Sequence, residues 1–157
     1  MSEPVMPVAV YPTGLGIYEI LPGLYQSGVP ETNQDWDLAW SLADIVVSLE
    51  CAGYWPGPDI PTGKLYIAWN IDDGPVPNLE TLAELDCLLT NFIQGLGRKV
   101  LIHCAAGVNR SGLLTARIVR SIALVSGRSA AEHVRSKRPG ALINPQFNDH
   151  LNNLHAI

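Results

Sequence analysis

The sequence has few cysteines, few charged residues and no long hydrophobic run. Charged residues make up 16% of its 157 residues and apolar residues 47%, a balance that excludes a disordered chain and favours one folded domain. No apolar stretch is long enough to span a bilayer, and prolines interrupt the N-terminal segment where a signal peptide needs a continuous apolar core. We therefore expect a cytoplasmic protein in which residues 1–12 are loosely held and residues 13–157 form the domain.

Positive charge is also scarce. Ten lysines and arginines stand against 15 aspartates and glutamates, and the resulting net charge of -5 disfavours nucleic acids and membranes as partners. The three cysteines are widely spaced and odd in number, and the four histidines show no metal-ligand spacing. Neither a disulfide framework nor a zinc site is predicted, so we expect no metal and no cofactor.

Strand-like and helix-like segments alternate along the chain. Short β-branched or aromatic runs between turn residues predict strands, and apolar residues at helical spacing predict helices. The expected strands lie at 16–20, 23–27, 44–50, 64–69 and 99–104, and the expected helices at 78–95, 111–127, 129–137 and 144–154. This alternation predicts a single α/β domain with a central, mostly parallel sheet flanked by helices. The most apolar run, at 99–104, suits the buried centre of the sheet.

Capping residues mark the expected ends of the helices. Asn78 is a predicted N-cap, and Gly95 is a predicted stop for the same helix. The next helix is expected to end at Gly127, and Ser129 then opens another in capping-box register with an acidic residue three positions later. Asn144 precedes a proline, which suits the first position of the last helix.

The turn at residues 103–112, with the sequence HCAAGVNRSG, joins the expected central strand to the next helix. Such a turn can point backbone N–H groups and the positive end of the helix dipole into one cup, which suits an oxyanion such as phosphate or vanadate. Gly107 allows a positive φ, and the guanidinium of Arg110 can hold two oxygens at once. The same positive field suits a sulfur nucleophile at Cys104. The turn therefore predicts an anion site with a nucleophile at its floor.

The order His, Cys, five residues, Arg and Ser in this turn resembles the signature of the cysteine-dependent protein tyrosine phosphatases, of the small dual-specificity type. The resemblance implies a phosphatase-like fold and hydrolysis of phosphomonoesters through a cysteinyl-phosphate on Cys104. It also implies that Ser111 stabilises the sulfur as it leaves, and that His103 orients the loop and favours the thiolate. The expected phosphate-binding residues are those of the loop: Ala105, Ala106, Gly107, Val108, Asn109 and Arg110.

A second loop, NIDDGPVPNLE at residues 70–80, offers two candidate general acids. The leaving oxygen needs a proton and the phosphoenzyme then needs an activated water, and one carboxyl group can serve both steps. The loop is similar to the family's acid loop. Asp73, which directly precedes Gly74 and stands four residues before Pro77, fits that arrangement better than Asp72. Asp73 is therefore the predicted acid and Asp72 the alternative, although both could instead be turn formers or helix-entry charges.

Two further segments extend the resemblance. LPGLYQSGVPE at residues 21–31 and RPGALINPQF at residues 138–147 are similar to the opening strand and the late segment of many small dual-specificity phosphatases. In the family the late segment braces the phosphate loop and helps to place the hydrolytic water, which makes Asn144 and Gln146 candidates for those roles. The alternative, a helix cap and a surface amide, is favoured.

The variable positions of the phosphate loop are uncharged, and this bears on the substrate. The family's phosphoinositide phosphatases carry lysines there, and its RNA 5′-triphosphatases share the Asn-Arg pair but have a histidine where this chain has Ala106. The resemblance therefore favours phosphotyrosine, and then phosphoserine and phosphothreonine, in protein substrates. RNA 5′-phosphates, phosphoinositides and small phosphorylated metabolites remain alternatives.

Two alternatives lie outside these enzymes. A rhodanese-like domain also places a cysteine in a strand-to-helix loop, but it does not explain the loop of Asp73 or the pair Ser111 and Gly112. A catalytically dead phosphate-binding module does not explain why nucleophile, arginine and acid are all present.

Cys51 follows the expected strand at 44–50. Its segment resembles the one that supplies a resolving cysteine in the family's lipid phosphatases, so oxidation could join Cys51 to Cys104. This pairing requires that the strand at 44–50 runs beside the strand at 99–104. The other interpretation, slightly favoured, is that Cys51 is only a small buried apolar residue.

Overall fold

The computed structural model describes residues 15–50 and 59–157. This part of the chain forms a five-stranded sheet with the strand order β1-β2-β5-β3-β4. Only the edge strand β1 runs antiparallel to its neighbour, and the other pairings are parallel. The strands are β1 (Tyr18–Leu21), β2 (Leu24–Ser27), β3 (Ile45–Ser48), β4 (Leu65–Ala68) and β5 (Val100–His103). The predicted α/β fold with a mostly parallel sheet is confirmed.

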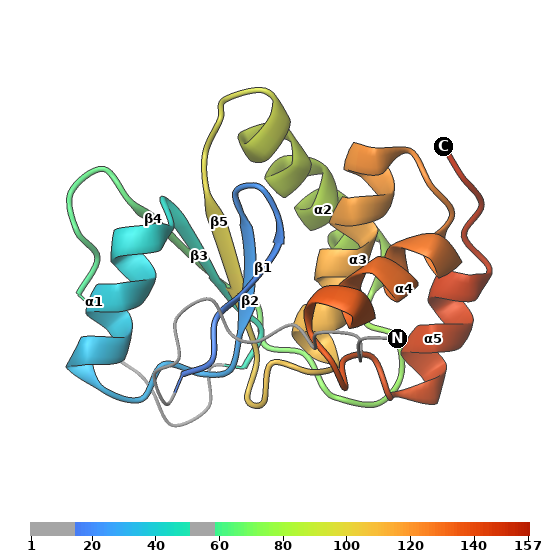
Figure 1. Ribbon diagram of the computed structural model, residues 1–157, viewed down its shortest axis with the longest axis horizontal. Coiled ribbons are helices and arrows are strands. Elements are labelled where there is room, and N and C mark those ends of the chain that lie inside the picture. Colours follow the sequence, from blue (N-terminus) through green and yellow to red (C-terminus); the bar gives the residue numbers. More distant parts are fainter. Residues whose placement is uncertain (1–14, 51–58) are drawn as a thin grey trace, which may run out of the picture.

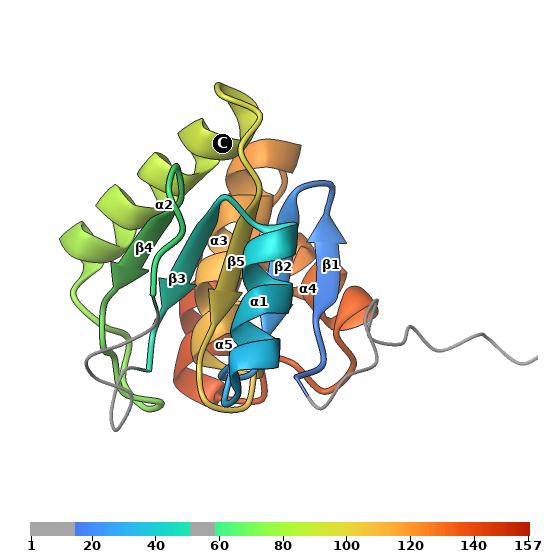
Figure 2. The same cartoon turned by 90° about the vertical axis from the view of Figure 1, so that its left-hand side faces the viewer.

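Helices cover both faces of the sheet, as Figures 1 and 2 show. One face carries α1, and the other carries α2, α3, α4 and α5. The helices are α1 (Asn33–Leu42), α2 (Leu79–Gln94), α3 (Arg110–Ala123), α4 (Gly127–Lys137) and α5 (Pro145–Asn152). Among the described residues, no helix has the length and apolar character needed to cross a membrane.

The central strand β5 contributes to two hydrophobic cores. Val100 and Ile102 pack into the large core under α2 to α5, whereas Leu101 packs into the smaller core under α1. This alternation follows from the two-residue repeat of a strand, and it explains why the whole run is apolar. The next residue on the α1 face, His103, is also buried, and Cys104 follows directly at the end of the strand. The strand therefore delivers the start of the HCAAGVNRSG turn to a fixed place.

The predicted helix ends are confirmed at two helices. The side chain of Asn78 accepts from the N–H of Thr81 at the start of α2, and Gly95 is its C-cap. At α5, Asn144 caps the backbone of Gln146 and Phe147. Both helices begin where a side-chain oxygen satisfies N–H groups that have no partner within the helix.

Two predicted boundaries near Gly127 are wrong. Helix α3 already ends at Ala123, followed by Leu124 in the left-handed conformation. The N-cap of α4 is Ser126, not Ser129, and Gly127 is the first residue of that helix. A Cβ on Gly127 would lie 2.1 Å from the carbonyl oxygen of Leu151. Gly127 therefore serves the close packing of α4 on the end of α5 and does not terminate α3.

Helix α1 is missing from the segments that the sequence patterns predict. It starts with a capping box, in which Thr32 accepts from the N–H of Asp35 while the Asp35 carboxylate accepts from the N–H of Thr32. Ala39 and Trp40 are buried, and the partly buried Trp36, Leu38 and Leu42 pack against the same core. Because a helix of ten residues is marginal in isolation, α1 is formed mainly by this packing on the sheet.

Two expectations concern residues outside the described ranges: the loosely held segment 1–12, and Cys51. The strand arrangement on which the Cys51 interpretation depends is present, since β3 runs parallel to β5 with Ser48 opposite His103.

Candidate active site

The loop at residues 104–109 lies between β5 and α3, at the edge of the sheet where the parallel strands end. Figure 1 shows that the loop before α2 and the loop between α4 and α5 reach the same edge. Binding sites of open α/β sheets form at this edge, because the loops after neighbouring strands meet there. The topology thus brings together segments that are far apart in the sequence.

Gly107 allows the loop to lie against strand β2. Its φ is +69°, and a Cβ at this position would lie 2.6 Å from the carbonyl carbon of Ser27 and from the nitrogen of Gly28. A side chain is thus excluded both by the backbone conformation and by the lack of space. The carbonyl of Gly107 accepts a hydrogen bond of 3.0 Å from the buried amide of Gln26. Sequence patterns do not single out Gln26.

Neighbouring segments hold the loop from outside at two further carbonyls. The N–H of Val29 donates to Ala105 O at 3.1 Å, and the N–H of Leu142 donates to Val108 O at 3.1 Å. The loop is therefore tied to the segment before α1 and to the segment before α5. Such ties keep a loop in one shape, which a pre-organised anion site requires.

Cys104 lies at the start of this loop and is 2% exposed. Its sulfur lies 3.3 Å from the hydroxyl of Ser111, a fully buried residue in the first turn of α3. Because α3 begins at Arg110, the positive end of its dipole lies close to the sulfur. The structure thus brings together Cys104, Ser111 and Arg110, as the sequence predicts.

The guanidinium of Arg110 is held by groups that sequence reasoning missed. Its Nη1 donates to the carboxylate of Glu50 at 2.7 Å and to the carbonyl of Ile71 at 3.2 Å. The Nε atom is buried and has no hydrogen-bond partner within the described residues. Glu50 lies two residues after the end of the buried strand β3, and parallel strand ends meet at one edge. This position is the signal that could have identified Glu50 from sequence.

His103 is 1% exposed and faces helix α1. Its Nε2 contacts the hydroxyl of Ser48, which also accepts a hydrogen bond of 2.8 Å from the hydroxyl of Tyr66. The ring of Trp36 packs edge-on against the imidazole at a centroid distance of 5.9 Å. Burial lowers the pKa of His103 to about 4, although the Cys104 backbone and the charge of Glu50 oppose this shift. The imidazole is therefore neutral at pH 7.

Asp73 lies beside the phosphate loop. One carboxylate oxygen accepts from the amide of Asn109 at 3.0 Å, and the other accepts from the amide of Asn144 at 2.8 Å. Asp72 is exposed, and its side chain has no hydrogen-bond partner in the described ranges. The structure therefore places Asp73, not Asp72, in contact with the loop.

The two late candidates, Asn144 and Gln146, differ in what they contact. Asn144 caps α5 with its Oδ1, as favoured from the sequence, and the Nδ2 of the same side chain donates to Asp73. Gln146 is exposed and supplies only its backbone N–H to Asn144.

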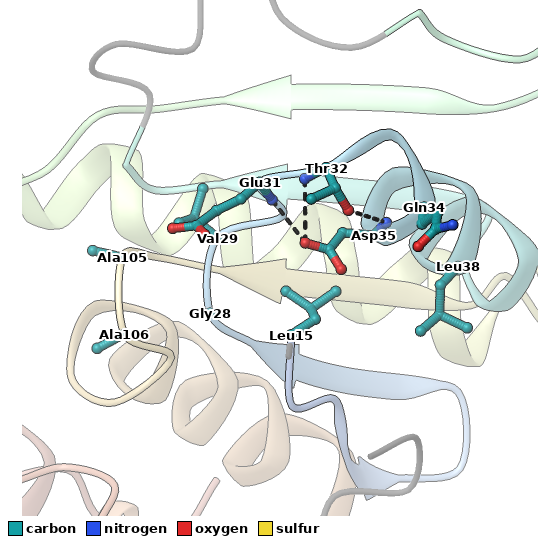
Figure 3. A pocket seen from close by; sticks show the side chains of 10 residues that line it. All are labelled: Leu15, Gly28, Val29, Glu31, Thr32, Gln34, Asp35, Leu38, Ala105 and Ala106. Carbon is teal, nitrogen blue, oxygen red and sulfur yellow. Dashed lines mark hydrogen bonds between the residues drawn. The ribbon is translucent and has the colours of Figure 1, made fainter. Parts of the chain in front are cut away.

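A cavity of about 630 Å³ adjoins the loop on the side of α1. Figure 3 shows Ala105 and Ala106 on one side of it, and the segment that enters α1 on the other. The wall includes the carboxylates of Glu31 and Asp35, of which Asp35 accepts from the Glu31 N–H at 3.0 Å. The cavity thus adjoins the anion loop but carries negative charge itself.

The fold and the site together define a class of enzyme. The central strand of the mostly parallel sheet leads into a cysteine, which is followed by an anion loop and by a helix that begins with arginine. This is the arrangement of a cysteine-based phosphomonoesterase. Residues 62–156 match the dual specificity phosphatase catalytic domain. The chain belongs to this family.

Individual relatives agree with this assignment. The chain is 30% identical over 138 residues to "MAP kinase phosphatase with leucine-rich repeats protein 3" of Dictyostelium discoideum, a match that covers 85% of this chain. It spans only 15% of the length of that relative.

Solved structures share the fold. Tk-PTP in its active form matches with a TM-score of 0.71 and 26% identity, over 87% of this chain and 95% of that chain. A mouse putative dual specificity phosphatase complexed with zinc tungstate matches with a TM-score of 0.71 and 21% identity, over 90% and 87% of the two chains. Human DUSP28 matches with a TM-score of 0.71 and 22% identity, over 94% of each chain.

Proposed function

We propose that this phosphatase hydrolyses phosphotyrosine in proteins, with phosphoserine and phosphothreonine as secondary substrates, and that Cys104 is its nucleophile. One observation carries the proposal. The buried sulfur of Cys104 lies 3.3 Å from the hydroxyl of Ser111 in the first turn of α3, Arg110 is the first residue of that helix, and the carboxylate of Asp73 accepts from Asn109 directly before it. A nucleophile, an anion clamp and a proton donor are the three parts that this hydrolysis needs.

The phosphoryl group binds in the loop at residues 104–109. Because Glu50 and Ile71 engage only Nη1 of Arg110, the buried Nε and the second amino group are available as a fork for two phosphate oxygens. Backbone N–H groups of the loop and the helix dipole stabilise the remaining charge. The mouse putative dual specificity phosphatase of the same fold was solved as a complex with zinc tungstate, and tungstate is a tetrahedral oxyanion like phosphate.

The first chemical step transfers the phosphoryl group to the enzyme. The sulfur of Cys104 attacks phosphorus, so that a P–S bond forms while the ester P–O bond breaks. Asp73 gives its proton to the leaving oxygen, which departs as a phenol or an alcohol. The neutral His103 beneath the loop holds the strand end through Ser48 and transfers no proton itself.

The second step regenerates the enzyme. Asp73 takes a proton from water, the water oxygen attacks phosphorus, and the P–S bond breaks to release phosphate. The hydroxyl of Ser111, 3.3 Å from the sulfur, donates a hydrogen bond to the departing thiolate. Each group thus acts in the step in which charge develops next to it.

The shape and charge around the loop favour a peptide over the alternative substrates. The loop itself offers no lysine for the extra phosphates of an inositol lipid or of an RNA 5′-triphosphate. The cavity beside Ala105 and Ala106 has room for residues that flank a phosphotyrosine, and its carboxylates would repel a polyphosphate.

The test compares Cys104→Ser with a matched control, Cys87→Ser, which removes an exposed cysteine on α2. Both proteins are assayed on phosphotyrosine, phosphoserine and phosphothreonine peptides, a phosphoinositide and RNA 5′-triphosphate. We expect Cys104→Ser to lose turnover by at least about a thousandfold while it still binds vanadate, because the loop and Arg110 remain. Cys87→Ser should match the wild type.

Residual turnover near the wild-type level in Cys104→Ser would contradict the nucleophile. A wild-type preference for the lipid or the RNA substrate would overturn the proposed substrate class while leaving the chemistry intact.

A further inference from the structure

We propose that Asn109 is a positioning residue that locks the general acid onto the phosphate loop. This inference rests on the proposed role of Asp73 as the proton donor. Asn109 lies in the loop immediately before Arg110, and its side chain reaches two other segments, the acid loop before α2 and the segment before α5. The amide of Asn109 therefore connects the phosphate loop, the acid loop before α2 and the segment before α5.

The orientation of this amide is fixed by its surroundings. Its Oδ1 accepts from the backbone N–H of Ile143 at 2.8 Å and from that of Asn144 at 2.9 Å. An inverted amide would point its NH₂ group at these two donors, so the inverted state is excluded. The Nδ2 atom must then face the carboxylate of Asp73, to which it donates at 3.0 Å.

A second amide completes the hold on Asp73. Asn144 donates from Nδ2 to the other carboxylate oxygen at 2.8 Å and to the carbonyl of Gly74 at 3.1 Å. Its own Oδ1 accepts from two N–H groups at the start of α5, so this amide cannot invert either. Because each carboxylate oxygen of Asp73 accepts from one amide, both the position of the carboxylate and the orientation of its plane are fixed.

The use of Asn109 at the start of a helix is unusual and supports a role in the site. Asparagine at an N-cap usually bonds to the N–H groups of its own helix. Asn109 is the N-cap of α3, yet its side chain makes no capping bond to that helix. Its hydrogen-bonding capacity is directed across the site, to Asp73 and to the backbone of Ile143 and Asn144.

The consequence is a mechanical link between phosphate binding and proton donation. Because Asn109 is part of the phosphate loop, the acid keeps its place relative to the bound phosphoryl group and its leaving oxygen. Loss of the Nδ2 donor frees one carboxylate oxygen, and the acid is then held only from the α5 side. Proton donation should suffer most for leaving groups that depart poorly without it.

Asn109→Asp separates the two ends of the amide. It keeps an oxygen that accepts from Ile143 and Asn144, but it replaces the donor toward Asp73 by a second oxygen. Asn109→Ala removes both ends, and Asp73→Asn removes the acid itself. As a control, Gln146→Ala changes an exposed amide in the first turn of α5 that supplies only its backbone N–H.

The variants are compared on phenyl phosphate, whose leaving group is poor, and on p-nitrophenyl phosphate, whose leaving group is good. We expect Asn109→Ala, which adds no charge to the phosphate loop, and Asn109→Asp each to lower kcat on phenyl phosphate by about tenfold more than kcat on p-nitrophenyl phosphate. Gln146→Ala should match the wild type on both substrates. In the Asp73→Asn background, a substitution at Asn109 should have no further effect on the ratio of the two kcat values.

Equal losses on both substrates, or an undiminished loss in the Asp73→Asn background, would overturn the positioning role. If Asp73→Asn itself leaves the leaving-group dependence unchanged, the proposed acid is wrong and the inference falls with it. These two failures are distinguished by the behaviour of Asp73→Asn alone.

Discussion

Gly107 illustrates how one residue sets the shape of the phosphate loop. Its φ of +69° is a conformation that residues with a side chain rarely adopt, and the space where a Cβ would stand is filled by the backbone of Ser27 and Gly28. Neither neighbour can give way, because both are main-chain atoms at the end of strand β2. The loop can pack against β2 only if this position has no side chain.

We predict that Gly107→Ala lowers activity by more than tenfold and stability by about 2–4 kcal/mol, because left-handed strain adds to a backbone clash. The matched control is Gly97→Ala, since Gly97 has a similar φ of +62° and a Cβ on it would meet no atom within 4 Å. That variant should cost only about 1 kcal/mol and leave activity unchanged. Urea unfolding and p-nitrophenyl phosphate turnover measure both effects. Equal losses in the two variants would show that the close approach to β2 is unimportant.

At the scale of elements, Arg117 joins three helices behind the site. It lies on α3 and donates from Nε to Asp86 of α2 at 2.6 Å, while its Nη1 lies 2.8 Å from Nε2 of His150 on α5. Burial raises the pKa of Asp86 although Arg117 opposes the shift, and burial together with the Arg117 charge lowers the pKa of His150. The positive charge of Arg117 thus compensates the negative charge of Asp86 within this cluster.

We predict that Arg117→Met destabilises the protein by about 2–4 kcal/mol, because Asp86 is left in the helix interface without its cation. The double variant Arg117→Met, Asp86→Leu should recover most of this loss, since it leaves no buried charge. Arg120→Met is the comparison and should cost less than Arg117→Met, because Arg120 donates an exposed bond to the carbonyl of His155 and acts on Asp86 through its charge without a hydrogen bond. Thermal unfolding measures all three. A double variant as unstable as Arg117→Met would show that packing, not charge, explains the effect.

At the scale of the whole molecule, His103 and His150 make stability depend on pH, because folding shifts their pKa values. Burial lowers the pKa of both, to about 4 for His103, from the ordinary value of 6.5. Below that ordinary value the unfolded chain binds protons that the folded protein does not, so stability falls as the pH falls toward the folded pKa. Asp86 has the opposite effect on stability. Because its pKa is raised in the folded protein, a falling pH favours the folded state as the carboxylate takes up a proton.

We predict that His103 alone removes roughly 3 kcal/mol of unfolding free energy between pH 7 and pH 4. Urea unfolding at pH 7, 5.5 and 4 measures the loss, with His103→Gln as the comparison because glutamine can still contact Ser48 and does not titrate. The variant should show a flatter pH dependence than the wild type. Parallel curves for the two proteins would rule out His103 as the source of the acid sensitivity.

The local sequence was sufficient to predict the part of the site that consecutive residues form. The turn from His103 to Gly112 could be placed between strand and helix from its residues alone, and the structure brings Cys104, Arg110 and Ser111 together as predicted. The reason is that a strand followed by a tight turn and a helix leaves little conformational freedom. The separation of these residues in the sequence therefore determines how far apart they lie in the structure. The confirmed caps at α2 and α5 have the same local origin.

The distant residues that complete the site could be identified only from the folded chain. Glu50 reaches Arg110, and Asn144 reaches Asp73, because parallel strands and the segment before α5 end at one edge of the sheet. The role of Gly127 likewise became clear only from the packing of α4 on α5. These contacts join segments tens of residues apart, and their free energy comes from burial and hydrogen bonds that exist only after folding. Local residue order thus accounts for the chemistry of the loop, whereas long-range packing selects the residues that hold the loop in place.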